Sequence, residues 1–241
     1  MNVIECAELG KRYRRSWALR DCTLSIPAGH VVALVGPNGA GKTTLLNLAV
    51  GLATATAGAV TVLDGLPAGS PDALDRIAFV AQDAPLYKNL PAADMLHVAR
   101  NLNRRWDQQR ARARLDEVGI PAQKKVGQLS GGQKAQLALT IALARRPDLL
   151  VLDEPLAALD PLARHEFMQS VMETVAADGI SVVLSSHVVA ELERMADYLI
   201  VLSFGRVTVA GKVDELVALH GGGLEEIVLA SMRESGKEVA A

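Results

Sequence analysis

A glycine-rich run from Gly36 to Thr43 has the spacing of a loop that binds phosphate. It reads Gly-Pro-Asn-Gly-Ala-Gly-Lys-Thr and matches the pattern G-x-x-x-x-G-K-[ST]. Glycines let backbone N–H groups converge on phosphate oxygens without an intervening Cβ atom. Lys42 is expected to reach the β- and γ-phosphates of a nucleotide, and the hydroxyl of Thr43 is expected to bind Mg²⁺. The run therefore predicts a nucleoside triphosphate site.

An acidic pair follows an apolar run further along the chain. Asp153 and Glu154 come directly after Leu149–Leu152. Ligands of open α/β sheets bind at the carboxyl ends of the strands, where this pair is expected. Asp153 would hold Mg²⁺ through water, and Glu154 would act as a general base toward the attacking water or polarise it. The alternative is an acidic turn that only ends a strand, and the glycine loop makes it the weaker interpretation.

The elements that position these groups are read from short apolar runs. Five runs are continuous rather than alternating, as in strands of a parallel sheet buried on both faces: Val31–Val35, Ile77–Val80, Leu149–Leu152, Val182–Leu184 and Leu199–Leu202. Helical patterns lie between most of them, the first at about Lys42–Val50, and this order indicates an α/β fold. Three earlier segments predict a smaller antiparallel sheet: Val3–Ala7, Ala18–Ile26 and Ala59–Leu63.

Residues from about Ala92 to Gln128 predict a helical lobe inserted in this core. One helix is indicated by apolar residues at helical spacing, namely Met95, Val98, Ala99, Leu102 and Trp106. A second helix is expected from Asp107 to Val118, ending at Gly119. After Gly221–Gly223 we expect a short helix from Leu224 to about Ser231, with a frayed end from Glu234 to Ala241.

Composition excludes several classes of function. The net charge of −2 gives no global attraction to nucleic acid, no stretch of about 18 uncharged apolar residues predicts a membrane span, and the N-terminus lacks a signal-peptide pattern. Cys6 and Cys22 match no metal spacing and are expected to be buried reduced thiols. His30, His97, His165 and His220 are interpreted as structural. One arginine cluster is expected to form a solvated face rather than a nucleic-acid site: Arg100, Arg104, Arg105, Arg110, Arg112 and Arg114.

The segment Leu129–Gln133 reads Leu-Ser-Gly-Gly-Gln and lies between the glycine loop and the acidic pair. Together the three elements resemble the ATP-binding cassette, the nucleotide-binding subunit of ABC transporters, over about Val3 to His220. The resemblance implies a P-loop NTPase (RecA-like) core with a mostly parallel sheet, an N-terminal antiparallel β subdomain and an inserted α-helical subdomain at about 90–135. It places the cassette at 1–220 and a short C-terminal helix and tail at 221–241. It also implies ATP and Mg²⁺ as cofactors.

Four further positions match the cassette family. Tyr13 fits the aromatic that stacks on adenine, with Trp17 as a nearby competitor; Gln82 fits the Q-loop, Asp160 the D-loop and His187 the switch histidine. The catalytic residues implied are Glu154, His187, Lys42 and Gln82, and the Mg²⁺ ligands implied are Thr43, Gln82 and Asp153. The nucleotide contacts implied are Tyr13, Gly36, Pro37, Asn38, Gly39, Ala40, Gly41, Lys42, Thr43, Thr44, Gln82, Ser130, Gly131, Gly132, Gln133 and Asp160.

The Leu129–Gln133 segment has its own physical logic. Ser130 supplies a hydroxyl, and Gly131 and Gly132 leave backbone N–H groups available at the start of a helix expected to reach Ala144, which makes a second anion-binding helix terminus. The family implies that this terminus closes over the γ-phosphate held by a facing protomer, so two chains would enclose two ATP molecules with twofold symmetry. This chain departs from the family after Gln133, with Lys134-Ala135-Gln136 in place of further glutamine and arginine residues, and at Leu156 in place of a small hydroxyl residue.

The resemblance also implies partners and a location. Separate transmembrane permease subunits are expected to dock near Asp83–Leu90, with Tyr87 and Leu90 as contacts, and no nucleic acid is expected. The protein would be cytoplasmic and peripheral on the inner face of the cell membrane. Export is favoured because the tail beginning Leu224-Glu225-Glu226-Ile227 resembles bacterial exporters and no regulatory domain is seen after the cassette. The alternatives are a soluble cassette ATPase, for example in iron–sulfur assembly, translation or DNA repair, and a regulatory binder that does not hydrolyse ATP.

Overall fold

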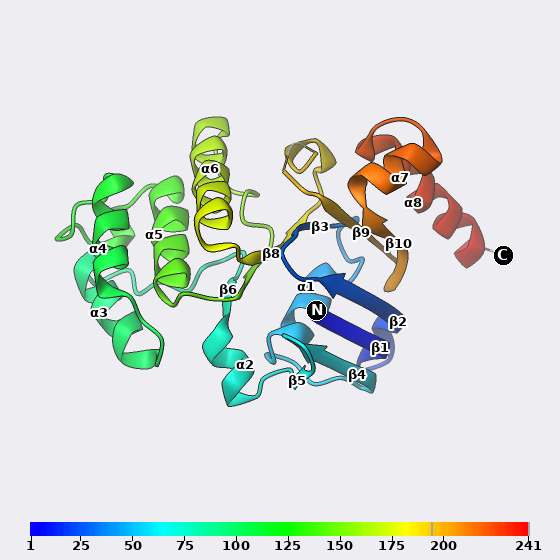
Figure 1. Cartoon of the computed structure of the whole chain (residues 1–241), viewed down its shortest axis with the longest axis horizontal. Helices are drawn as coiled ribbons and strands as arrows, with labels where there is room; N and C mark the ends of the chain where they lie inside the picture. Colours follow the sequence, from blue (N-terminus) through cyan, green and yellow to red (C-terminus); the bar gives the residue numbers. More distant parts are fainter. Residues whose placement is uncertain (194, 241) are drawn as a thin grey trace. The chain divides into compact units, whose positions relative to one another are not determined.

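The computed structural model describes residues 1–193 and 195–240. The chain forms two compact units (Figure 1): Met1–Leu74 together with Ser181–Ala241, and Asp75–Ile180. Helix α2 (Pro71–Arg76) spans the passage from the first unit to the second. Within the described residues, no helix is long and apolar enough to cross a membrane.

The first unit begins with an antiparallel sheet whose strand order is β2-β1-β4-β5. The strands are β1 (Asn2–Tyr13), β2 (Ser16–Pro27), β4 (Ala57–Val62) and β5 (Leu66–Pro67). A two-residue turn joins β1 to β2, and Arg14 in this turn has a left-handed φ of 52°. Ile4 pairs with Ile26 and Cys6 with Leu24, so that apolar side chains alternate toward the core. This antiparallel subdomain agrees with the sequence prediction.

The same unit contains four strands in the order β10-β9-β3-β8. Strand β3 (Val31–Val35) runs parallel to both β8 (Ser181–Ser186) and β9 (Tyr198–Ser203), and β10 (Arg206–Lys212) is antiparallel to β9. Every residue of β3 and β8 is buried, which explains their continuous apolar sequences. The helices of this unit are α1 (Lys42–Ala49), η2 (Val189–Glu191), α7 (Val213–His220) and α8 (Leu224–Ala240).

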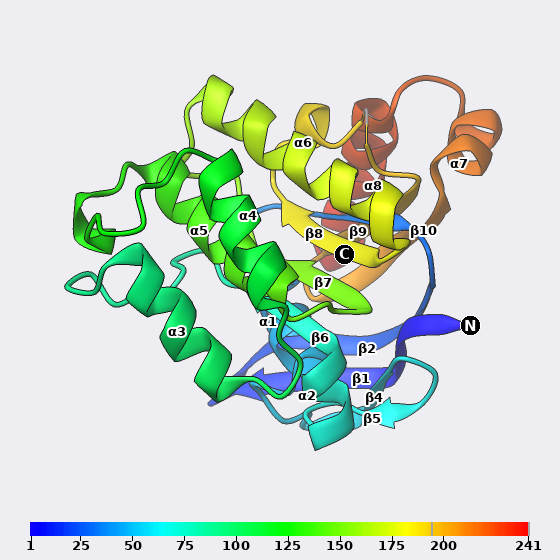
Figure 2. The ribbon, with the colours of Figure 1, turned by 60° about the vertical axis from the view of Figure 1, so that its left-hand side comes forward.

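The second unit combines a parallel strand pair with a helical lobe. Strand β6 (Ile77–Val80) pairs with β7 (Leu149–Leu152) over their full lengths. The α-helices of this unit, labelled in Figure 2, are α3 (Ala92–Leu102), α4 (Gln108–Glu117), α5 (Gly131–Ala144) and α6 (Pro161–Asp178). A short 3₁₀ helix, η1 (Val126–Gln128), precedes α5. Met95, Leu115 and Leu137 belong to one buried cluster that joins α3, α4 and α5. Helix α5, which begins at Gly131, is thus anchored in a packed lobe.

Two expectations about helices are corrected. Leu102 was expected on the apolar face of the first lobe helix, but it is 76% exposed because α3 ends there and Asn103 turns to an extended conformation. Trp106 consequently lies beyond the helix and packs against the cluster from a loop. The C-terminal helix is longer than expected, since α8 continues to Ala240 instead of fraying from Glu234. The sequence after Ser231 contains no proline to stop its backbone ladder. Ala241 lies outside the described residues.

Candidate nucleotide-binding site

The glycine loop lies in the first unit, between the end of β3 and the start of α1. A Cβ atom on Gly36 would lie 2.2 Å from the carbonyl oxygen of Leu202 in β9, so only glycine fits at the end of the strand. Gly41 has a φ of 106°, and a Cβ atom there would lie 2.5 Å from the carbonyl oxygen of Ala18. These close approaches fix the backbone of the loop against its neighbours. Because α1 begins at Lys42, directly after Gly41, its N-terminal turn faces the loop.

Lys42 is held along this loop. Its Nζ atom donates to the carbonyl oxygens of Gly36 at 2.7 Å and Pro37 at 3.3 Å, and the residue is only 6% exposed. The first turn of α1 contains no acidic residue, so the partial positive charge of the helix N-terminus is not offset by its own side chains. A buried ammonium and a helix terminus together suit a polyphosphate.

Two aromatic rings lie at the tip of the β1–β2 hairpin. Tyr13 is 49% exposed, with Lys11 Nζ 5.0 Å from its ring centroid. Trp17 is 40% exposed and has the Arg12 guanidinium 5.5 Å from its ring centroid. Both rings present enough surface to stack on a base, and each has a positively charged side chain over it. The hairpin thus provides the aromatic that the sequence predicted together with its expected competitor.

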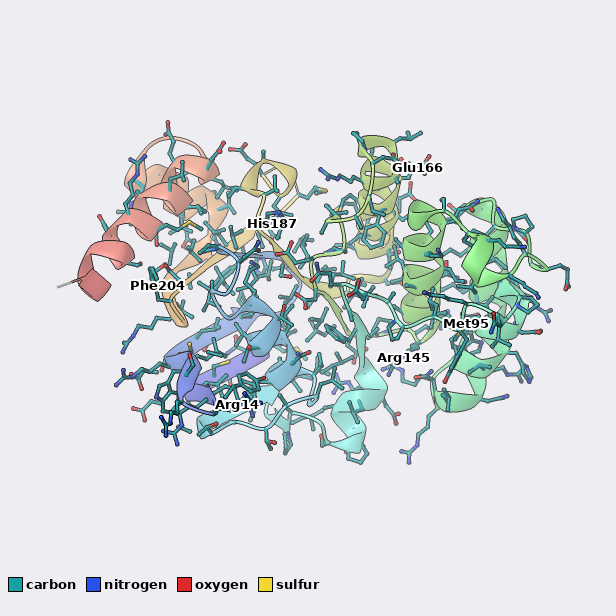
Figure 3. All side chains as sticks on the ribbon, turned by 180° about the vertical axis from the view of Figure 1, so that it is seen from behind. Arg14, Met95, Arg145, Glu166, His187 and Phe204 are labelled. Carbon is teal, nitrogen blue, oxygen red and sulfur yellow. The ribbon has the colours of Figure 1, made fainter. Side chains whose placement is uncertain are left out.

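His187 comes directly after β8 in the first unit and is exposed (Figure 3). Its neighbour Ser186 shapes the backbone here, because the Ser186 hydroxyl accepts a hydrogen bond from the N–H of Val188 at 3.0 Å. The structure therefore places His187 at the carboxyl end of a buried strand, as its sequence position indicated.

The acidic pair follows β7 in the second unit. Asp153 is 3% exposed, and its N–H donates to the carbonyl oxygen of Val80 at 2.9 Å, so β6 and β7 end together. Glu154 has a φ of 46°, a left-handed conformation that is uncommon for a residue with a side chain. Such strain of about 1–3 kcal/mol is concentrated at functional sites, which supports a functional reading of Glu154.

Gln82, Gly131 and Glu154 line one cavity of about 520 Å³ in the second unit. The wall of this cavity also includes the residues directly after Gln82 and the side of Lys134. The structure thus brings together Gln82, the proposed base Glu154 and the first glycine of the signature segment (Leu129–Gln133). The contribution of Lys134 was not predicted, because its only sequence signal is a departure from the family pattern.

The signature segment Leu129–Gln133 forms the start of α5. Ser130 is the N-cap, with Oγ accepting from the N–H of Gln133 at 3.1 Å, and Gln133 Oε1 accepts from the N–H of Ser130 at 3.2 Å. A Cβ atom on Gly132 would lie 2.8 Å from Cβ of Ala163 in α6, so glycine permits close packing of the two helices. The first turn of α5 contains no acidic residue, which leaves a second helix N-terminus suited to an anion.

Asp160 lies near this helix start but has a structural contact of its own. It caps α6 by accepting a hydrogen bond from the N–H of Ala163 at 3.0 Å, and it lines a cavity of about 410 Å³ with Ser130 and Gln133. The sequence placed Asp160 among the nucleotide contacts, and the structure adds a helix-capping role to that prediction.

Three of the six arginines in the cluster pair with carboxylates, and a fourth is buried. Arg104 lies 3.4 Å from Asp75, Arg105 lies 3.4 Å from Asp148, and Arg110 pairs with Asp178. Arg114 is 8% exposed, and burial lowers its pKa. The expectation of a solvated arginine face is therefore wrong for Arg114, because its side chain reaches across to α5. Paired carboxylates also reduce the positive potential that nucleic acid would require.

The two cysteines follow the sequence prediction. Cys6 and Cys22 are both buried free thiols, and burial raises the pKa of Cys6 to about 12. Among the described residues, no group of three or more histidine, cysteine or carboxylate side chains could hold a metal ion.

Comparison with known proteins identifies the family. A sequence profile described as "ABC transporter" matches residues 19–157, and a profile described as "AAA domain, putative AbiEii toxin, Type IV TA system" matches residues 124–193. The lantibiotic transport ATP-binding protein SrtF of Streptococcus pyogenes is 32% identical over 88% of this chain and 92% of that protein. The aliphatic sulfonates import ATP-binding protein SsuB of Albidiferax ferrireducens is 38% identical, over 88% and 73%. The Nod factor export ATP-binding protein I of Cupriavidus pinatubonensis is 33% identical, over 89% and 68%.

Solved structures agree with these sequence relatives. The ATP-binding subunit of an ABC transporter superposes with a TM-score of 0.83 at 28% identity, covering 95% of this chain and 99% of the other. A dimeric post-hydrolysis state of the ATP-binding cassette MJ0796, bound to ADP and phosphate, gives a TM-score of 0.77 at 29% identity, covering 87% and 98%.

Proposed function

Because this chain belongs to the ABC transporter family as an ATP-binding cassette that hydrolyses ATP to ADP and phosphate, we propose that it powers an exporter as a dimer. The observation that carries the proposal is a pair of glycine-rich helix starts, neither of which has an acidic residue in its first turn. One follows the glycine loop at α1, and the other follows Ser130 at α5. Each suits a phosphate group.

The first terminus would bind the nucleotide of its own chain. The loop from Gly36 to Thr44 offers backbone N–H groups to the phosphates, Lys42 leaves its carbonyl partners to contact the β- and γ-phosphates, and Tyr13 stacks on adenine. Oxygen atoms of Thr43, Gln82 and Asp153 would hold Mg²⁺ together with the phosphates. This all-oxygen donor set suits Mg²⁺, which commonly uses few protein ligands beside substrate phosphates. Bound there, the ion would neutralise charge on the transferred phosphoryl group.

The second terminus would complete the site of a facing protomer. Ser130, Gly131 and Gly132 would donate to the γ-phosphate held by the other chain, with Gln133 and Asp160 beside it. The dimeric state of the related cassette with ADP and phosphate supports this arrangement. Its twofold symmetry would place two ATP molecules between two copies. A heterodimer with a second cassette would use the same contacts.

Hydrolysis would then open the dimer. Glu154 orients or deprotonates the attacking water, and His187 and Gln82 contact the γ-phosphate region, so catalysis depends on positioning and charge stabilisation. Loss of the γ-phosphate removes the anion that joins two protomers. Opening and closing would be transmitted to permease subunits through Asp83–Leu90. Tyr87 is 62% exposed, which supports its role as a contact residue.

Location and direction complete the proposal. The cassette, taken as residues 1–220 with a C-terminal extension, would lie on the cytoplasmic side of the membrane, held there by its permease. The segment that supports export forms the start of α8, with Leu224 and Ile227 buried in the first unit. The relatives named above include both an exporter and an importer, so direction needs its own experiment. In a strain that lacks the gene for this protein, a compound that accumulates in the cells and is depleted from the medium indicates export. A compound that is depleted from the cells and stays in the medium indicates import.

The test of the ATPase proposal is Glu154→Gln. ATP with Mg²⁺ is expected to trap this variant as a dimer, measured by light scattering after size exclusion, while phosphate release falls about a hundredfold or more through loss of the general base. Glu225→Gln, an exposed carboxylate on α8, is the matched control and should release phosphate like the wild type. Unchanged phosphate release from Glu154→Gln would exclude Glu154 from its role. Co-purification with a polytopic membrane protein would separate a transporter from a soluble cassette ATPase.

A further inference from the structure

A buried hydrogen bond joins the lobe helix α4 to the signature helix α5. Arg114 Nη2 donates to Gln136 Oε1 at 3.2 Å, and the two residues are 8% and 7% exposed. Within the described residues, the buried Nε atom of Arg114 has no hydrogen-bond partner. A buried, incompletely satisfied guanidinium destabilises a fold, so its presence calls for an explanation beyond packing.

Gln136 lies one helical turn after Gln133, the residue that closes the cap on Ser130. Its own carbonyl oxygen accepts a hydrogen bond from the hydroxyl of Thr140 at 2.8 Å, so both its side chain and its backbone are fixed. The turn that it follows contains Gly131 and Gly132, each costing about 1 kcal/mol of helix propensity relative to alanine. The first turn therefore depends on the Ser130–Gln133 cap for its order, and the next turn is held through Gln136.

Charged side chains of the second unit act on Arg114. Burial lowers the pKa of its guanidinium and Arg110 lowers it further, whereas Glu117 and Glu173 favour its charged form. Both glutamates and Gln136 also line the cavity that contains Ser130 and Gln133. Arg114 thus connects α4 to the wall of the cavity next to the signature segment.

We propose that Arg114 is a positioning residue: through Gln136 it sets the rotation of α5 and thereby the direction of the Ser130–Gln133 turn toward the γ-phosphate of the facing protomer. This inference rests on the proposed function. Gln136 belongs to the short segment in which the chain departs from the glutamine and arginine residues usual in the family. Here Arg114 on α4 supplies the positive charge, and the side-chain oxygen of Gln136 on α5 accepts a hydrogen bond from it.

The test exchanges the two residues in the Glu154→Gln background. Arg114→Gln should weaken the ATP-induced dimer about tenfold, an effect typical of a lost buried hydrogen bond to a charged group. ATP affinity of the dilute protomer, titrated with a fluorescent ATP analogue, should not change. The double variant Arg114→Gln/Gln136→Arg restores a cation and an amide at the same contact and should recover dimerisation. Arg114→Lys should recover it in part, since lysine keeps the charge without the planar donor pair.

Arg112→Gln is the matched control, because Arg112 is an exposed arginine on the same helix. It should dimerise like the Glu154→Gln parent. Equal dimerisation of the Arg114→Gln and parent proteins would overturn the inference. If Arg114→Gln alone does not fold, the exchanged double variant decides: recovery supports the inference, and a folded but weakly dimerising protein overturns it. Failure of the parent itself to dimerise with ATP would count against the proposed function instead.

Discussion

Ser130 and Gln133 satisfy each other at the start of α5: the Ser130 hydroxyl accepts from the Gln133 N–H at 3.1 Å, and the Gln133 side chain accepts from the Ser130 N–H at 3.2 Å. This reciprocal cap uses one side chain at each end of a turn whose middle is Gly131-Gly132. The cap fixes the turn without placing a Cβ atom over the middle amides. The serine therefore has a role in helix stability that can be separated from its proposed role toward phosphate.

Substitutions at Ser130 should separate these two roles. Ser130→Asp keeps an N-cap acceptor but adds negative charge, so we expect stability close to wild type and loss of the ATP-induced dimer in the Glu154→Gln background. Ser130→Ala should lower the free energy of unfolding by about 1 kcal/mol through loss of the cap. Urea denaturation and size exclusion measure the two effects. ATP-induced dimerisation of the aspartate variant at the parent level would show that Ser130 does not approach phosphate.

Tyr13→Ala should weaken ATP binding by about 1–3 kcal/mol, the range for a base stacked on an aromatic ring. Tyr13→Phe should bind nearly as well as wild type because it keeps the ring. Titration with a fluorescent ATP analogue provides the measurement, and Trp17→Ala is the paired control at the other exposed ring. The stack would be assigned to Trp17 if its loss weakened binding while Tyr13→Ala did not.

Asp107→Ala should destabilise the protein in a pH-dependent manner. Asp107 caps α4 by accepting from the Arg110 N–H at 2.9 Å, and its other oxygen lies 3.0 Å from Arg146 Nε. The Arg110 hydrogen bond, more than the nearby arginines, lowers the pKa of Asp107 in the folded state. Its stabilisation is thus present above the unfolded pKa of about 3.9 and is lost as the pH falls through the lower folded value.

The expected loss for Asp107→Ala is about 1 kcal/mol near neutral pH, measured by urea denaturation. This difference from wild type should shrink below about pH 4. Asp107→Asn retains a capping oxygen and is expected to lose only the smaller contribution of the Arg146 ion pair. A deficit for the alanine variant that stays constant through the acid range would contradict the assignment.

Cys6 and Cys22 should resist alkylation in the folded protein at about pH 8 and react once it is denatured. The thiolate is the nucleophile, and burial raises the pKa of Cys6 to about 12 and that of Cys22 above its ordinary value. The raised pKa values favour the folded state below the unfolded thiol pKa of about 8.5, and this contribution decreases as the pH rises above it. Mass spectrometry after iodoacetamide treatment measures the modification; rapid labelling of native Cys6 would contradict its burial.

The sequence predicted best the elements whose pattern is local. The continuous run Val31–Val35 coincides with β3, and Leu149–Leu152 coincides with β7, because strands buried on both faces require uninterrupted apolar residues. The sequence prediction failed at Leu102. The apolar periodicity continues from there to Trp106, but helix α3 ends at Leu102. A hydrophobic pattern does not record where the backbone ladder ends, so boundaries depend on caps and tertiary packing.

The sequence by itself identified the groups on which the proposed chemistry rests. The glycine loop, the signature segment and the acidic pair are sets of neighbouring residues, and their expected roles come from residue type, spacing and the resemblance to the cassette family. The tertiary structure decided the contacts between residues distant in sequence, such as Leu202 over Gly36 and Arg114 on Gln136. It also decided that Arg114 is buried while Arg112 is exposed. The physical reason is that burial and hydrogen-bond partners depend on which elements pack together, and one-dimensional periodicity does not specify that packing.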